Sequence, residues 1–150
     1  MSRNKNQNQA TVEDYINHLL TGGFLGNAAP NKHIELATEF DAGATSIIFE
    51  GVRVYFRDGV IDPGVGMIQF QAPVFKDFIA TPELTNQVAH TSKVLLSVEL
   101  VDIGGGKSDL VISADLLFTG ESERDAFQMA IYLMNICSAH EQLYDSLEGI

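Results

Sequence analysis

The sequence predicts an α+β domain in which helices pack on one antiparallel sheet of about five strands, in the order α-β-β-β-α-β-β-α. Apolar residues recur at helical spacing near both ends of the chain, whereas between them apolar and polar residues alternate and short turns separate the segments. The chain has 150 residues, 45% of them hydrophobic, which suffices for one substantial core. Because residues 1–10 are Asn/Gln-rich and have no apolar anchor, we expect a disordered tail there and a single domain over residues 11–150.

The first helix is expected to begin at Thr11, an N-cap residue followed by acids, and to end at Gly22-Gly23. Residues 26–30 are expected to form a loop. Alternating patterns then predict three strands with a turn between the first two and an Asp58-Gly59 hairpin turn after the second. These strands are expected over residues 33–40, 46–57 and 65–71.

Thr81-Pro82-Glu83 combines an N-cap, a proline at the first helical position and an acid, and it predicts a short helix to about His90. Two apolar-rich strands are expected over residues 93–103 and 109–118, joined by a glycine-rich turn. The last helix is expected to start near Ser122, where Asp125 is spaced as in a capping box, and to continue to about Leu147.

Charge and composition exclude several classes of function. With 9 Lys+Arg against 20 Asp+Glu, the net charge is −11, which disfavours binding to nucleic acid or to an anionic membrane. No apolar run is long enough to span a bilayer, and no apolar segment of a signal peptide follows the first residues. The single cysteine, Cys137, cannot form an internal disulfide. We therefore expect a cytoplasmic protein.

Two short segments resemble catalytic motifs but lack an essential residue. Gly104–Ser108 resembles the end of a phosphate-binding loop, but Val101 stands where that motif needs glycine, and a strand follows instead of a helix. His140-Glu141 begins like a zinc-protease motif, but Tyr144 occupies the place of the second histidine. Cys137 lies among apolar helix residues and is expected to be a buried, unreactive thiol. The sequence thus predicts no catalytic, cofactor or metal site.

The last helix is apolar over more than one face. Besides its main apolar stripe, Phe127, Ile131 and Met134 form a second face, which is either buried within the chain or covered by another chain. The strand that begins at residue 93 is also apolar on both faces, so one face needs a cover. The expected partner-binding residues are Phe127, Ile131, Met134, Val94, Leu96 and Val98.

The element order, the acidic pI near 4.5, the length and the amphipathic last helix resemble the YbjN-like family and the structurally related class I type III secretion chaperones. The most similar stretch runs from Pro82 to Leu147. The resemblance implies a bacterial, non-enzymatic homodimer that binds an extended segment of another protein along its sheet and helix surface.

The predicted function is a chaperone-like or regulatory protein-binding module that acts as a homodimer. A first alternative is a small-molecule-binding protein or enzyme whose site forms only in the fold, from side chains such as His33, Tyr55 and Glu99. A second is an acidic decoy or inhibitor, of phage or effector type, that occupies a basic nucleic-acid site on its target. Residues 76–150 hold 12 acidic and 4 basic residues and thus −8 of the net charge, which is compatible with that alternative.

Overall fold

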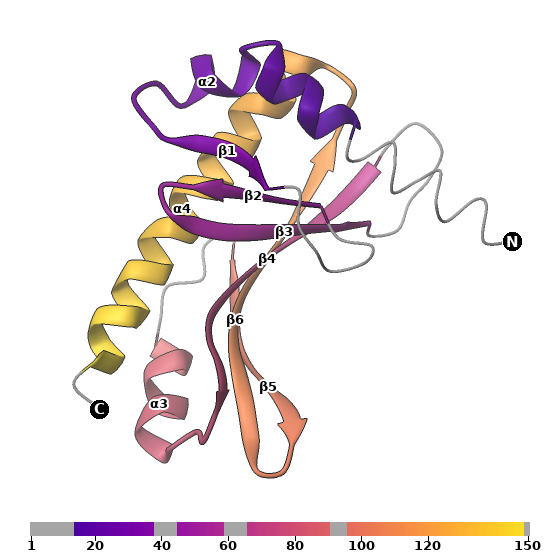
Figure 1. Ribbon diagram of the computed structural model, residues 1–150. Coiled ribbons are helices and arrows are strands. Elements are labelled where there is room, and N and C mark those ends of the chain that lie inside the picture. Colours follow the sequence, from indigo (N-terminus) through magenta and orange to yellow (C-terminus); the bar gives the residue numbers. More distant parts are fainter. Residues whose placement is uncertain (1–13, 38–44, 59–65, 91–95, 149–150) are drawn as a thin grey trace, which may run out of the picture.

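The computed structural model describes residues 14–37, 45–58, 66–90 and 96–148 (Figure 1). Within them, the first helix occupies residues 14–21 and ends before Gly22-Gly23, as predicted. The other elements are α2 (Phe24–Ala28), β1 (Ile34–Ala37), β2 (Thr45–Phe49), β3 (Val52–Asp58), β4 (Gly66–Phe78), α3 (Pro82–His90), β5 (Ser97–Gly104), β6 (Lys107–Phe118) and α4 (Ser122–Glu148). The predicted tail over residues 1–10 and the turn after the first strand lie outside the described residues.

The described strands form one antiparallel sheet in the order β1-β2-β3-β4-β6-β5. The predicted α+β class with an antiparallel sheet is therefore confirmed, with six strands where about five were expected. The sheet twists strongly, so that β2 and β3 run across the direction of β5 and β6 (Figure 1). The long strand β4 connects these two halves of the sheet.

The additional strand comes from a turn that the sequence analysis missed. Residues 46–57, predicted as one strand, are two strands that pair with each other from Thr45↔Phe56 to Phe49↔Val52. Glu50 and Gly51 form the turn with φ of 50° and 84°, the left-handed conformation that tight hairpins require at both central residues. Glycine adopts it freely, whereas glutamate rarely does, so the segment looks like uninterrupted strand in the sequence.

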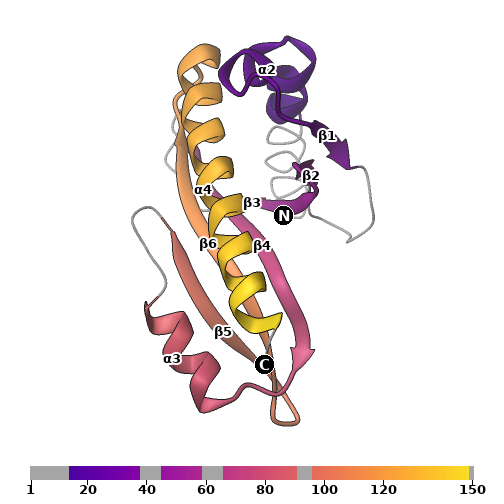
Figure 2. The ribbon, with the colours of Figure 1, turned by 90° about the vertical axis from the view of Figure 1, so that its left-hand side faces the viewer.

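All helices lie on one face of the sheet, and α4 crosses β4 and β6 on that face (Figure 2). Side chains of β4 and β6 alternate accordingly: Phe70 and Ile112 face the helices and are fully buried, whereas the cross-strand pair Met67 and Leu117 is exposed on the other face. A core of 24 buried apolar residues runs from Ile16 in the first helix to Leu143 in α4 and joins both layers.

Two other elements differ from the prediction. Residues 24–28, expected to lie largely in a loop, form the short helix α2. Its N-cap residue, Gly23, provides no side-chain hydrogen bond, so packing of the fully buried Leu25 holds this helix in place. Strand β4 continues to Phe78 instead of ending near residue 71. It passes Pro73 with register shifts on either side of Phe75, which is where a proline without an N–H can be accommodated in a central strand.

One predicted helix cap and one predicted hairpin turn are confirmed. The Thr81 hydroxyl accepts the Leu84 N–H at 3.2 Å and so caps α3. Gly104, Gly105 and Gly106 all have positive φ and join β5 to β6 as a hairpin. The segment that resembles a phosphate-binding loop therefore leads into a strand, as its sequence context predicts.

The start of α4 depends on a carboxylate with no exposed surface. Asp125 accepts hydrogen bonds from the backbone N–H groups of Thr119 and Gly120, each at 2.9 Å, from the Thr119 hydroxyl, and from the Tyr15 hydroxyl of the first helix. The predicted capping box, in which the Ser122 hydroxyl would accept the Asp125 N–H, is not formed. The Asp125 N–H donates to the Glu121 carbonyl instead, and the Ser122 hydroxyl lies 2.9 Å from His18 Nε2. Asp125 thus joins the first helix, the end of β6 and α4.

We expect Asp125→Ala to lower the free energy of unfolding by about 3 kcal/mol, because it leaves two backbone N–H groups without an acceptor in a partly buried junction. Tyr15→Phe should cost about 1 kcal/mol, the typical net value of one hydrogen bond. Urea denaturation followed by circular dichroism measures both. Glu123→Ala, an exposed acid in the same turn, is the control and should change the stability by less than about 0.5 kcal/mol.

The same junction should make stability depend on alkaline pH. Burial, reinforced by the hydrogen bond to Asp125 and by its charge, raises the pKa of Tyr15 well above its ordinary value of 10. The stabilisation from the protonated phenol is therefore complete below pH 10 and is lost as the pH rises further. A Tyr15→Phe variant that loses stability as steeply as the wild type above pH 10 would contradict this role.

Candidate functional site

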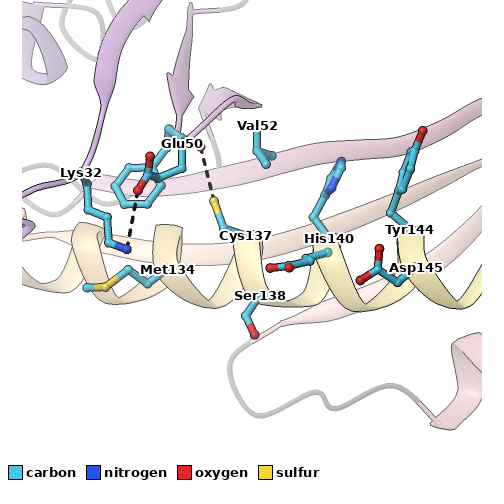
Figure 3. Close-up of a pocket in the computed structure, with 11 residues that line it drawn as sticks. Lys32, Glu50, Val52, Met134, Cys137, Ser138, His140, Tyr144 and Asp145 are labelled. Atoms are coloured by element: carbon cyan, nitrogen blue, oxygen red, sulfur yellow. Dashed lines mark hydrogen bonds and ion pairs between the residues drawn. The ribbon is translucent and has the colours of Figure 1, made fainter.

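An open groove of about 620 Å³ lies between α4 and the turn that joins β2 to β3 (Figure 3). Residues 32 and 49–52 form one wall, and one flank of α4 forms the other. The lining residues are Lys32, Phe49, Glu50, Val52, Met134, Cys137, Ser138, His140, Glu141, Tyr144 and Asp145.

The first wall is held in place by contacts around Glu50. Its N–H donates to the His33 carbonyl at 2.8 Å, and its carboxylate lies 3.6 Å from the ammonium group of Lys32. These contacts join the β2–β3 turn to the segment that enters β1. Since both charged side chains are about 40% exposed, the ion pair positions the wall more than it stabilises the fold.

Cys137 connects the two walls. Its thiol donates a weak hydrogen bond to the Phe49 carbonyl at 3.4 Å, which Figure 3 shows as a dashed line across the groove. Burial, with a further contribution from the charge of Glu50, raises the pKa of this thiol to about 11. The thiol is therefore protonated at neutral pH, as expected for an unreactive cysteine, although it is only partly buried.

The other end of the groove is aromatic. The Tyr144 ring stacks on Phe75 of β4 with ring centroids 5.2 Å apart, and the His140 ring stacks parallel to Tyr144 at 6.3 Å. Burial lowers the pKa of His140 below its usual 6.5, although a hydrogen bond to the Pro73 backbone partly opposes this shift. His140 is thus a neutral, partly buried helix residue, as predicted. Among the described residues, no group of three His, Cys, Asp or Glu side chains could hold a metal ion.

The groove carries an excess of negative charge at its aromatic end. Glu141 and Asp145 are exposed, lie one helical turn apart on α4, and pair with no basic side chain of the described residues. Lys32, the basic residue of the lining, already pairs with Glu50 near Met134, at the opposite end (Figure 3).

The structure separates the predicted partner-binding residues into two groups. Phe127, Ile131 and Met134 share the outward face of α4, where Phe127 is 59% and Met134 37% exposed. Ile131 is partly buried. Phe127 and Met134 are therefore not core residues of the described chain, and burial within the chain does not explain the apolar character of these two side chains. Of the three, only Met134 lines the groove.

The second group lies on or beside β5, at the edge of the sheet. Leu96 and Val98 are partly buried and pack against the core, so they offer less surface to a partner than expected. Val94 lies outside the described residues. Leu96 also lines a smaller and mostly polar hollow of about 300 Å³, which contains Glu99 and Asp115 as well.

The residues suggested for a fold-assembled small-molecule site do not come together. His33 precedes β1 and Glu99 lies in β5, the two opposite edges of the sheet, so about five strand spacings, or roughly 24 Å, separate them. Tyr55 lies on β3 between them, on the face opposite the helices. The prediction that these three side chains could form one site was wrong, because the order of the strands in the sheet could not be derived from the sequence.

The fold is an α+β domain, and its groove is open and lined by both apolar and charged side chains, with Glu141 and Asp145 at its aromatic end. Comparisons with protein-family models, curated proteins and solved structures returned no match. Within the described residues, no helix is both long and apolar enough to cross a membrane.

We expect iodoacetamide to alkylate Cys137 slowly at neutral pH, because a pKa of about 11 gives about a hundredfold less thiolate than an ordinary pKa of 9.0. The alkylation rate, followed by mass spectrometry, should still rise steeply above pH 9. The urea-unfolded protein is the control and should titrate normally. A folded-state rate that levels off near pH 9 would show that the groove does not shield the thiol.

Proposed function

We propose that this protein is a non-enzymatic protein-binding module that holds a segment of another protein in the groove between α4 and the β2–β3 turn. The observation that carries the proposal is the groove itself, which is open and to which both walls contribute apolar side chains, Val52 and Met134 among them, beside charged ones (Figure 3). Small-molecule sites enclose most of their ligand, whereas an extended or helical segment needs an open groove.

The hydrogen-bond partners of Cys137 and His140, the two groups of the lining whose types could form a catalytic pair, support binding over catalysis. A nucleophilic cysteine needs a base within hydrogen-bonding reach to withdraw its proton. Here the Cys137 thiol donates to the Phe49 carbonyl and the His140 ring bonds to the Pro73 backbone, so each is engaged with main chain instead of with the other. Both groups therefore act as parts of the wall.

A chaperone-like or adaptor role agrees with the resemblance to the YbjN-like family and the class I type III secretion chaperones. The resemblance rests on element order. The described chain keeps that order but adds one strand through the Glu50-Gly51 turn and one short helix, α2. Both additions lie in the first half of the chain, which also contributes the first wall of the groove.

A homodimer is the second part of the proposal. Phe127 and Met134 are exposed on the outward face of α4, with the partly buried Ile131 between them, and an apolar surface of this kind suits a two-fold contact between identical helices. The dimer contact would centre on Phe127 and Ile131, which lie outside the groove, and would leave Met134 at its margin accessible to a bound segment.

Peptides selected from a random display library against the protein should depend on the apolar lining of the groove. Met134→Ala and Tyr144→Ala should each weaken their binding about fivefold or more, since each removes a side chain that a bound segment would cover. Leu117→Ala is the matched control, because it removes an exposed apolar side chain on the opposite face of the sheet, outside both the groove and the proposed dimer contact. Selected peptides that are insensitive to both groove variants would refute this function.

The protein should sediment as a homodimer at micromolar concentration, and Phe127→Glu or Ile131→Glu should give a monomer with an unchanged circular dichroism spectrum. Each variant places an unpaired charge in the apolar contact, at a cost of a few kcal/mol. Gln142→Glu adds the same charge to an exposed position of α4 about two turns beyond Met134 and should leave the dimer intact. A wild-type protein that sediments as a monomer would end the dimer proposal.

A further inference from the structure

We infer that the groove selects a segment that is basic as well as apolar, with a Lys or Arg side chain seated beside Glu141 and Asp145. This inference rests on the proposed function and specifies the chemistry of the partner. Its first support is charge: the groove lining carries three carboxylates against one ammonium group, and that ammonium group already pairs with one of the three. The two remaining carboxylates lie together at the aromatic end.

The position of these two acids in α4 makes a cationic partner favourable for a second, independent reason. Glu141 and Asp145 are spaced i, i+4, a separation at which like charges repel. They also lie in the last two turns of the helix, near its negative end, and the last turn holds no basic residue. A cation bound between them relieves both unfavourable interactions together.

The apolar part of the segment has its own place in the groove. Val52 of the first wall and Met134 of α4 provide apolar surface toward the Lys32–Glu50 end, whereas Asp145 lies at the Tyr144 end (Figure 3). Tyr144 is 44% exposed and adjoins both regions. The lining thus offers apolar surface between the Lys32–Glu50 ion pair at one end and two carboxylates at the other, which suits a segment with apolar side chains followed by a basic one.

Charge also decides against a second copy of this chain at the acidic end of the groove, which the proposed dimer contact leaves free. Each copy carries a net charge of −11, so an acidic groove would repel most of its own surface. An anionic membrane is repelled for the same reason. A basic segment of another protein is attracted both by the groove and by the overall field of the molecule.

Three fluorescein-labelled peptides of about twelve residues, in which leucine alternates with lysine, serine or glutamate, test the inference by fluorescence anisotropy. We expect the lysine peptide to bind at least about tenfold more tightly than the serine peptide and the glutamate peptide to bind most weakly. Raising NaCl from about 50 to about 500 mM should remove most of the difference between the lysine and serine peptides.

A matched pair of double variants separates the groove from the general acidity of the protein. Glu141→Gln with Asp145→Asn should weaken the lysine peptide about tenfold and leave the serine peptide unchanged. Glu99→Gln with Asp115→Asn removes the same charge from the hollow beside β5 and should change neither peptide by more than about twofold. Equal losses in both double variants would show non-specific attraction and overturn the inference.

The remaining outcomes distinguish the inference from the function on which it rests. Serine and lysine peptides that bind equally, with both weakened by Met134→Ala, would overturn the basic preference and leave the groove as a protein-binding site. If none of the three peptides binds while library-selected peptides do, the inference fails and the proposed function stands. If neither kind binds, both are refuted.

Discussion

The hydrogen bonds to the buried carboxylate of Asp125 are the constraint on which the rest of the structure depends. They fix where β6 ends, where α4 begins and where the first helix rests, because donors from all three regions converge on one side chain. The cost of removing a charge from water is offset only if such donors surround it. From this junction α4 extends for 27 residues across the sheet, so its starting point and direction decide which residues face the β2–β3 turn.

The long helix α4 has a side that packs on the sheet and a side that reaches solvent. One side, including Met129, Leu133 and Ile136, is fully buried against the sheet and supplies much of the core. The opposite side and one flank reach solvent, and there the character changes along the helix from apolar at Phe127 to acidic at Asp145. The apolar residues that the sequence shows on two faces of this helix therefore belong to a core side and to an exposed side.

Sequence patterns predicted the features that depend on neighbours in the chain. The N-cap at Thr81, the glycine hairpin after Gly104 and the helix end at Gly22 follow from local backbone chemistry, and all three are present. The Glu50-Gly51 turn was missed because glutamate is unusual at a positive φ, and without that turn neither the sixth strand nor the first wall of the groove could be predicted. The groove joins Lys32 and Glu50 to residues more than 80 positions later, and no local pattern reports such a contact.

The acidic end of α4 is the feature least explained by the fold alone. Placing Glu141 and Asp145 one turn apart near the negative end of a helix costs roughly a few tenths of a kcal/mol for the pair and a similar amount for the dipole. Neither acid contributes a hydrogen bond or an ion pair within the described residues. By contrast, Asp125 at the other end of the same helix is fully used by the fold. A helix in which the buried acid Asp125 is satisfied internally, while Glu141 and Asp145 face an open groove, has its unused charge where a partner can reach it. A cation there would stabilise the helix end as it binds.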